Sequence, residues 1–346
     1  VSCWGRGLWG QLGNGGNTDA TTPTLTDSLG TGRTAVSVSL GGQHTCALLD
    51  NGAVSCWGNH YYGQMGNGAS SNQRSPALTS SFGTGRTAIA LSVGLNFNCA
   101  ILDNGDVSCW GQGENNGQLG NGAASNKNTP TLTNSLGTGR TAVSISSGNF
   151  HACAVLDDGS VSCWGRNAYG QLGNSGTNNQ YSPTPTSSLG NGRTAIDLSA
   201  GGSHTCAILD NDAVSCWGEN VRGQLGYGGT AQKNSPTPTA NIGSSVILVN
   251  TIPRVDCDIG QYGLYMCVDA PLGKYVQSNG SMYATDSWAG YFVNQTGQSS
   301  QTPCLAGTYQ SLIGQSSCDD ADAGHFVSLP AQPAQSPCLV GTYQAL

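Results

Sequence analysis

The sequence has few charged residues, and this scarcity limits the partners that it can bind. Only 9% of its 346 residues are Asp, Glu, Lys or Arg, against roughly 25% in an average soluble protein. Nineteen acidic and twelve basic residues give a formal net charge of -7. Because nucleic-acid binding depends on clustered Lys and Arg side chains, this composition argues against a nucleic-acid partner.

Several motifs that would indicate chemistry are also missing. There is no Cys-x-x-Cys pair, which argues against a zinc ribbon or a thioredoxin-like site. No nucleophile–base pair, paired carboxylate site or phosphate-binding loop is evident, so we expect no catalytic residues, no metal site, no cofactor and no enzymatic activity. No apolar stretch approaches 18 residues, so we expect no membrane span. Because the sequence opens on Val1 without Met or a signal peptide, we expect a processed or partial piece of a longer secreted protein.

What the sequence does contain is an internal repeat. The pentapeptide Val-Ser-Cys-Trp-Gly occurs five times, beginning at Val1, Val54, Val107, Val161 and Val214. The spacing is 53 residues except for one step of 54, where a loop holds one additional residue. A period of this size held over five copies indicates a repeat architecture.

Each pentapeptide after the first follows an apolar run and a turn. Asp50-Asn51-Gly52 is a strong hairpin signal, and Cys46 and Cys56 are equidistant from Asn51. Opposed cysteines in antiparallel strands are close enough for a disulfide. We therefore predict four bridges: Cys46–Cys56, Cys99–Cys109, Cys153–Cys163 and Cys206–Cys216. The alternative is free, buried cysteine packing as a small apolar residue.

A second signature, Gly-Gln-Leu-Gly or Gly-Gln-Met-Gly, follows each pentapeptide, beginning at Gly10, Gly63, Gly117, Gly170 and Gly223. Together the two signatures resemble the regulator-of-chromosome-condensation (RCC1) repeat in its cysteine-bearing microbial form, over roughly residues 1 to 250. The resemblance implies a β-propeller with one four-stranded blade per repeat and usually seven blades. It implies little about function, because propellers host unrelated activities.

The expected fold is thus all-β, with a propeller of about five repeats, incomplete in this sequence, over residues 1–254. Within the first period we expect strands at residues 1–5, 21–26 and 34–40, followed by the cysteine hairpin. The fifth period loses its Gly-Arg-Thr-Ala segment and hairpin, and we place the domain boundary near Arg254. A strand at residues 246–252 that closes a five-bladed ring is the competing arrangement.

Other residues recur with the period. The arginines either form an anion-binding ring or cap turns, and we favour the turns; they are Arg33, Arg86, Arg140 and Arg193. Histidines at one position are interpreted as core or hydrogen-bonding residues, because the second repeat has Phe97 there; they are His44, His151 and His204. The aspartates of the hairpin turns are interpreted as turn formers; they are Asp50, Asp103, Asp157 and Asp210.

Residues 255–346 form a second, cysteine-rich array. The motif Cys-x-x-Gly-x-Tyr begins at Cys257, Cys304 and Cys338, and the last two copies give a period of 34. The array loosely resembles the cysteine-rich repeats of tumour-necrosis-factor-receptor type, and such small units depend on disulfides. We predict the disulfides Cys257–Cys267 and Cys304–Cys318, no partner within this chain for Cys3 and Cys338, and glycosylation sequons at Asn279 and Asn294.

Two functions fit these features. The first is an extracellular structural protein, a subunit of a surface filament, sheath or stalk that contacts other copies of itself or further segments of the same polypeptide. The alternative is a secreted adhesion or recognition module that binds a glycan or a cell-surface protein on a propeller face. Both place the chain outside the cell, because fourteen cysteines at regular spacings suggest an oxidising compartment.

Overall fold

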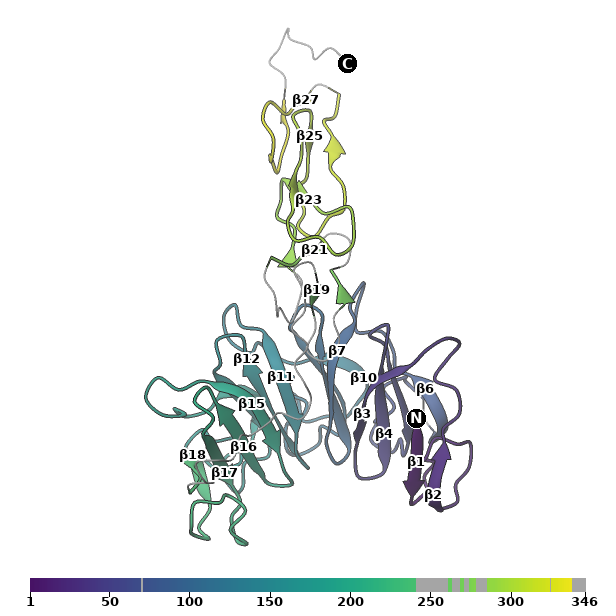
Figure 1. Ribbon diagram of the computed structural model, residues 1–346, viewed down its shortest axis with the longest axis vertical. Helices are drawn as coiled ribbons and strands as arrows, with labels where there is room; N and C mark the ends of the chain where they lie inside the picture. The colour runs from purple at the N-terminus through teal and green to yellow at the C-terminus, as the bar shows by residue number, and fades with distance from the viewer. Residues whose placement is uncertain are drawn as a thin grey trace. The chain divides into compact units, whose positions relative to one another are not determined.

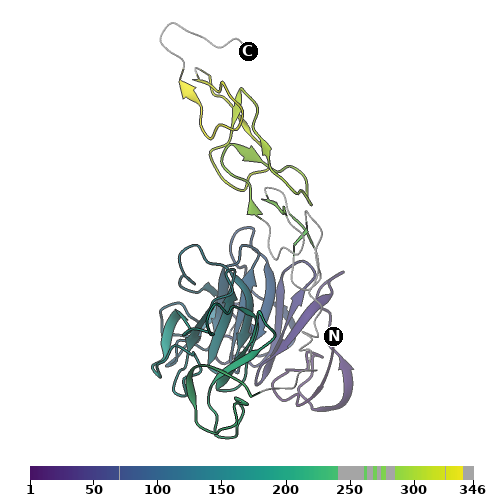
Figure 2. The ribbon, with the colours of Figure 1, turned by 60° about the vertical axis from the view of Figure 1, so that its left-hand side comes forward.

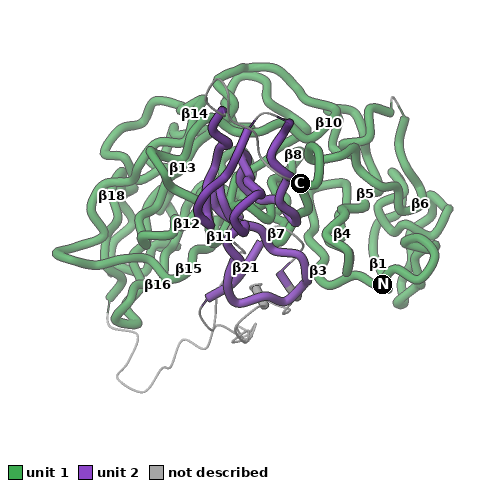
Figure 3. The backbone as a smooth tube through the Cα atoms, turned by 90° about the horizontal axis from the view of Figure 1, so that it is seen from above, with its two compact units in different colours: residues 1–249 green, residues 250–346 purple. Residues whose placement is uncertain are grey.

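The computed structural model describes residues 1–69, 71–240, 261–262, 268–270, 274–277, 285–323 and 325–337. The chain divides into two compact units, Val1–Val249 (unit 1) and Asn250–Leu346 (unit 2), which are coloured separately in Figure 3. The predicted domain boundary near Arg254 and the predicted strand at residues 246–252 lie outside the described residues. In the described ranges, no helix is long and apolar enough to cross a membrane.

Unit 1 is a β-propeller built from antiparallel sheets (Figures 1 and 2). A two-stranded sheet of β1 (Ser2–Gly5) and β2 (Ala20–Leu25) comes first in the chain. Four four-stranded sheets follow among the described residues, and we number these blades I to IV. Blade I comprises β3 (Ala35–Leu40), β4 (His44–Leu49), β5 (Val54–Gly58) and β6 (Gln73–Leu78). Blade II comprises β7 (Ala88–Val93), β8 (Phe97–Leu102), β9 (Val107–Gly111) and β10 (Lys127–Leu132). Blade III comprises β11 (Ala142–Ser147), β12 (His151–Leu156), β13 (Val161–Gly165) and β14 (Gln180–Pro185). Blade IV comprises β15 (Ala195–Ala200), β16 (His204–Leu209), β17 (Val214–Gly218) and β18 (Lys233–Pro238).

The strands of each blade run in chain order from the inside of the propeller to its rim. The first strands of neighbouring blades contact each other, β3 with β7, β7 with β11, and β11 with β15. The fourth strands β6, β10, β14 and β18 lie on the outer side (Figure 3). In blades I to III every residue of the second and third strands is buried, so the core lies along the middle of each blade and between adjacent blades.

The blades are out of phase with the sequence repeat. The pentapeptide forms the third strand of a blade, and the following Pro-containing strand completes that blade on its outer edge. The remaining two strands of the same period open the next blade. Each period therefore connects two neighbouring blades covalently.

The cysteine hairpins join the second and third strands of each blade. Cys46 lies directly opposite Cys56, and their disulfide has a Cα–Cα distance of 4.1 Å. The same pairing occurs in the other blades, as Cys99–Cys109, Cys153–Cys163 and Cys206–Cys216. Gly52 closes the first of these turns at φ +74°, and its amide donates to the Leu49 carbonyl at 2.9 Å. Cys3, in the two-stranded sheet, is a half-buried free thiol.

Unit 2 is a series of short hairpins, each made of two-residue strands. They are β19 (Gln261–Tyr262) with β20 (Val268–Asp269), β21 (Lys274–Tyr275) with β22 (Thr285–Asp286), β23 (Tyr291–Phe292) with β24 (Thr302–Pro303), β25 (Thr308–Tyr309) with β26 (Asp319–Asp320), and β27 (His325–Phe326) with β28 (Ser336–Pro337). The last four hairpins begin at residues 274, 291, 308 and 325, and the structural period is therefore 17 residues. The 34-residue period expected from the cysteines is wrong as the structural unit, because the cysteine motif precedes only some of the hairpins. The position of Cys304 is Ser287 one hairpin earlier and Ala321 one hairpin later.

Backbone hydrogen bonds connect the hairpins of unit 2 at a constant offset. The Val276 amide donates to the Gln298 carbonyl, and the Val293 amide donates to the Gln315 carbonyl, both at 3.0 Å. Cys304 and Cys318 form a disulfide with a Cα–Cα distance of 5.8 Å. Asn294 is exposed. The other predicted features of this unit, at Cys257, Cys267, Cys338 and Asn279, lie outside the described residues.

Candidate functional site

A repeated hydrogen bond joins each blade to its predecessor. The indole Nε1 of Trp57 donates to the Gln11 carbonyl of the preceding Gly-Gln-Leu-Gly turn at 3.0 Å. The equivalent pairs are Trp110 with Gln64, Trp164 with Gln118, and Trp217 with Gln171, at 2.9 to 3.0 Å. All four indoles are fully buried. The turn lies close against the ring: a Cβ on Gly66 would sit 2.6 Å from Trp110 Nε1. These two signatures therefore hold the blades together and are not available for a ligand.

The recurring histidines are also part of the framework. His44 Nε2 lies 2.9 Å from Asn98 Oδ1 in the next blade, and His151 Nε2 lies 2.9 Å from Thr205 Oγ1. Burial disfavours the charged imidazolium and lowers the pKa of His44 to about 4. In blade II the position is Phe97, which packs in one core cluster with an apolar residue, Ala152. The predicted core or hydrogen-bonding role is confirmed for His44 and His151, whereas His204 is half-buried.

The recurring arginines each lie beside a turn aspartate of the same blade. The Nη1–Oδ1 distances are 3.2 to 3.4 Å in the pairs Arg33–Asp50, Arg86–Asp103, Arg140–Asp157 and Arg193–Asp210. Each pair connects the segment before the first strand to the turn after the second strand. A paired guanidinium is a weaker anion site than a free one, which agrees with the preferred turn role. The aspartates do more than form turns, because they also accept from the arginines.

The opposite end of each blade is where the repeats differ. We call the segments that follow each pentapeptide the Trp-Gly loops; they are residues 6–9, 59–62, 112–116, 166–169 and 219–222. Their sequences are Arg-Gly-Leu-Trp, Asn-His-Tyr-Tyr, Gln-Gly-Glu-Asn-Asn, Arg-Asn-Ala-Tyr and Glu-Asn-Val-Arg. The strand before and the Gly-Gln turn after them are nearly invariant. This variation on a constant framework is typical of a binding surface in a repeat protein.

The first residue of a Trp-Gly loop contacts the loop between the first two strands of its own blade. Asn59 Nδ2 donates to Gln43 Oε1 at 2.8 Å in blade I. In blade II the direction is reversed, and Asn96 Nδ2 donates to Gln112 Oε1 at 3.2 Å. In blade III the guanidinium of Arg166 lies 5.9 Å from the centre of the Phe150 ring. Blades I to III thus present three different pairs of side chains on this face.

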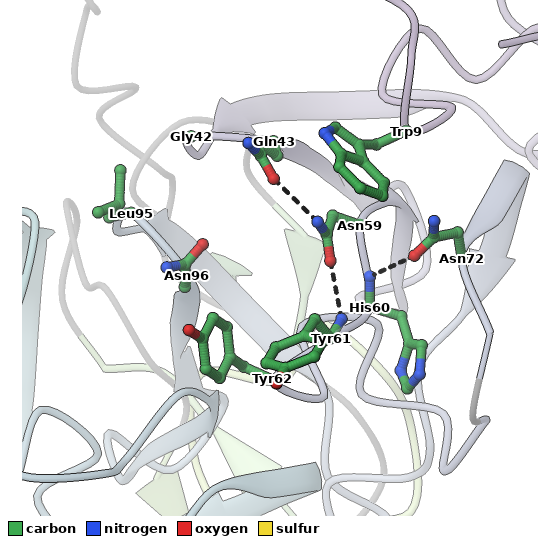
Figure 4. Close-up of a pocket in the computed structure, with 10 residues that line it drawn as sticks. All are labelled: Trp9, Gly42, Gln43, Asn59, His60, Tyr61, Tyr62, Asn72, Leu95 and Asn96. Carbon is green, nitrogen blue, oxygen red and sulfur yellow. Dashed lines mark hydrogen bonds between the residues drawn. The ribbon is translucent and has the colours of Figure 1, made fainter.

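A pocket of about 860 Å³ opens on this face where four loops meet (Figure 4). Trp9 comes from the loop after β1, the Trp-Gly loop 59–62 belongs to blade I, and Leu95 and Asn96 come from blade II. Gly42, Gln43 and Asn72 complete the lining. The volume lies within the range of about 300 to 1,000 Å³ that is usual for small-ligand pockets.

Hydrogen bonds fix the lining of the pocket. The buried Asn59 side chain bridges two segments, because Oδ1 accepts from the Tyr61 amide at 2.8 Å while Nδ2 bonds to Gln43. The His60 amide donates to Asn72 Oδ1 at 3.0 Å. The Tyr61 and Tyr62 rings pack edge to face, with their centres 4.8 Å apart. The loop is therefore ordered before any ligand arrives, and Tyr61 remains 77% exposed.

The pocket offers aromatic faces, side-chain amides and one imidazole. Aromatic faces can stack on a ligand, and the amides and the imidazole can donate hydrogen bonds to it or accept them from it. In the described part of the chain, no group of His, Cys, Asp and Glu side chains could hold a metal ion. Sequence reasoning did not identify these pocket residues, although one signal was present: the Trp-Gly loops are the part of the period that changes most from copy to copy.

Comparison with known proteins identifies relatives of unit 1. Residues 1–260 match the RCC1-like domain. Human E3 ubiquitin-protein ligase HERC2 is 30% identical over 231 residues, 66% of this chain and 5% of that protein. The ultraviolet-B receptor UVR8 of Arabidopsis thaliana is 31% identical over 229 residues, 66% of this chain and 51% of that protein. The chain therefore spans about half or less of these relatives. The crystal structure of Prp20p from Saccharomyces cerevisiae, described with its binding to Gsp1p and histones, superposes with a TM-score of 0.62 at 25% identity, over 71% of this chain and 60% of Prp20p.

Proposed function

This chain belongs to the family of RCC1-like domains, and on that premise we propose that it is an extracellular recognition module that binds its partner through the Trp-Gly loops. The family sets the scaffold, and the site on the scaffold sets the function. The opposite end of the blades carries the repeated Arg–Asp pairs, which are nearly identical from blade to blade.

One observation carries the proposal. The Trp-Gly loops differ in every repeat of this chain, while the strands and turns on either side of them hardly change. The residues that differ are not needed for blade packing, which relies on the buried Trp and the Gln carbonyl. Two of these loops, through Trp9 and residues 59–62, supply half of the described residues that line the ordered pocket of Figure 4.

Two further features support an extracellular, non-nucleic-acid role. Five disulfides join cysteines among the described residues, and such bonds persist in oxidising compartments. The net charge of -7 and the twelve basic residues offer little attraction for phosphate backbones. The proposed partners are therefore a glycan or a cell-surface protein, and no catalytic step is proposed.

The repeats themselves provide a test by loop exchange. We expect that replacing residues 59–62 with the Arg-Asn-Ala-Tyr sequence of residues 166–169 leaves the unfolding midpoint nearly unchanged, because both loops occupy the same framework. The variant should nevertheless lose the binding profile of the parent chain on an array of glycans and extracellular proteins. The matched control exchanges residues 80–85 for residues 187–192 at the Arg–Asp end and should keep the profile. Identical profiles for the parent and the loop variant would refute the proposal.

Assembly into a filament, sheath or stalk is the second candidate function. It is favoured by apolar side chains that remain exposed on strand β3, where Val36 is 38%, Val38 41% and Leu40 69% accessible. Exposed apolar strand residues are a common route to association between copies. Electron microscopy of the native protein tests this candidate: regular filaments would support it, and discrete monomers at micromolar concentration would exclude it.

A further inference from the structure

The pocket of Figure 4 has no acidic, lysine or arginine side chain among its described lining residues. A charged ligand enclosed there would lose water without gaining a counter-charge, which is costly. The complementary ligand is therefore neutral.

Aromatic rings form much of the pocket wall. In Figure 4, Trp9 lies on one side of the pocket and the rings of Tyr61 and Tyr62 lie on another, with Asn59 between them. Leu95 is the only residue with a large aliphatic side chain among the described lining residues. An apolar peptide side chain would find few aliphatic partners here. Aromatic faces with polar neighbours instead suit ligands that have both apolar faces and polar edges.

Polar groups at the edge of the pocket are left with spare hydrogen-bonding capacity. Gln43 uses Oε1 to accept from Asn59, and Asn72 uses Oδ1 to accept from the His60 amide, so the NH₂ group of each is free to donate. Two further atoms, Trp9 Nε1 and His60 Nδ1, are shielded from water and have no partner in the described part of the chain. Because these two atoms are shielded, we assign the hydrogen bonds to a ligand to the two amide groups alone.

The other blades do not repeat this combination. The Trp-Gly loop of blade II contains Glu114, that of blade III contains Arg166, and that of blade IV contains Glu219 and Arg222. Loop 6–9 also carries a charged residue, Arg6, but Arg6 does not line this pocket, so the lining is uncharged and aromatic among the described residues. An uncharged pocket beside blade I, next to charged Trp-Gly loops in blades II to IV, is expected if this pocket is specialised for one ligand.

We infer that this pocket binds a neutral sugar ring, with the flat face of the ring stacked on Trp9 or Tyr62 and its hydroxyl groups bonded to Gln43 and Asn72. The inference rests on the proposed function, because it names the ligand class of the same loop face. Sugars combine the required properties: they are uncharged, carry several hydroxyl groups and present C–H faces to aromatic rings. Discrimination would come from the fixed amides, since a site built to bond hydroxyl groups rejects ligands that lack them.

The test is direct titration of the full chain with defined oligosaccharides. The probes are chitotriose, cellotriose, mannotriose and lactose as neutral ligands, with a heparin-derived tetrasaccharide as the acidic comparison, measured by calorimetry and followed by a neutral-glycan array. We expect at least one neutral saccharide to bind with a Kd of roughly 10 µM to 1 mM. At least one of Trp9→Ala and Tyr62→Ala should weaken that binding tenfold or more, and Tyr62→Phe should retain it. The control is Leu78→Ala, which removes an exposed apolar side chain from β6 of the same blade.

The outcomes separate this inference from the proposed function. Circular dichroism and the unfolding midpoint must match the parent chain for each variant, and Tyr62→Phe provides a folded comparison if an alanine variant is unstable. Absence of binding across the neutral probes and the array, stronger binding of the acidic tetrasaccharide, or binding that survives both alanine changes would overturn the sugar site. If the loop exchange alters binding to a protein while every saccharide is ignored, the recognition face stands and the sugar ligand is wrong.

Discussion

Replacing His151 and Thr205 with Phe and Ala should make the protein less sensitive to mild acid. The double variant His151→Phe/Thr205→Ala copies the pair Phe97/Ala152, which the chain itself uses at the equivalent position between blades II and III. The ring environment is the same at both positions. A Cβ on Gly148 would meet His151 Cε1 at 2.3 Å, and one on Gly94 would meet Phe97 Cε1 at 2.1 Å. A Phe ring should therefore fit without repacking.

The size of the effect follows from the histidine pKa values. Burial, with a smaller contribution from His204, lowers the pKa of His151 to about 3, and burial lowers that of His44 to about 4. The unfolded chain takes up these protons as the pH falls below about 6.5, whereas the folded chain does not. Folding stability is therefore lost between pH 6.5 and the folded pKa, and each histidine accounts for about 2 kcal/mol between pH 7.5 and pH 5. The pKa of half-buried His204 is also lowered and contributes with the same sign.

Urea unfolding at the two pH values measures this difference. The buried tryptophans report on unit 1 by fluorescence, with the disulfides left intact. We expect the parent chain to lose about 4 kcal/mol from His44 and His151 together on going to pH 5, and the double variant to lose about 2 kcal/mol less. Thr205→Ser keeps the hydroxyl and should behave as the parent does. Asp158, whose pKa is lowered by its hydrogen bonds to Ser160, titrates below this window. Equal losses in the parent and the double variant would refute the buried-neutral interpretation.

Three further results are expected. Trp164→Phe should lower the unfolding free energy by about 1 kcal/mol, because the hydrogen bond to the Gln118 carbonyl is lost. An unchanged urea midpoint would show that this hydrogen bond does not stabilise the fold. Replacing both Cys153 and Cys163 with Ser should cost about 2 to 4 kcal/mol, measured the same way after peptide mapping of the parent bridge. Asn294→Gln should remove one glycan mass from protein secreted by a eukaryotic host, and equal masses would exclude that sequon.

The sequence was sufficient to predict the blades because the information is local and repeated. Opposed cysteines at a constant offset of ten define the register of a hairpin, and the structure shows Cys46 opposite Cys56 and Cys99 opposite Cys109. The alternation of apolar and small polar residues in Ala35–Leu40 also indicates a strand, although its apolar residues Val36, Val38 and Leu40 are the exposed ones. The matching family then supplies the propeller arrangement, which local patterns alone do not determine.

What the sequence did not reveal depends on contacts between repeats. The partner of His44 is Asn98, 54 residues away, and nothing in a single period indicates that these two side chains meet. The pocket has the same origin, because Trp9 and Leu95 reach it from separate periods. In unit 2 the cysteines obscured the shorter period, since several units lack the cysteine while a glycine recurs every 17 residues from Gly273 to Gly324. The glycosylation of Asn279, the disulfide Cys257–Cys267 and the unpaired Cys338 stay predictions, because these residues lie outside the described ranges.

The phase shift between the sequence period and the blade has a consequence for how such a chain can grow or be cut. A duplication of 53 residues beginning at a pentapeptide inserts the outer half of one blade and the inner half of the next, so the new copy arrives already joined to both neighbours. Every copy also carries a Gln-bearing turn for the tryptophan that follows it. Gain or loss of a whole period therefore keeps the strand order of every blade, whereas the side-chain pairs between blades, such as His44 with Asn98, are changed at the new junction. A fragment made of whole blades must instead be cut between blades. Residues 80–86 are such a place, because a cut there divides neither a disulfide nor a strand.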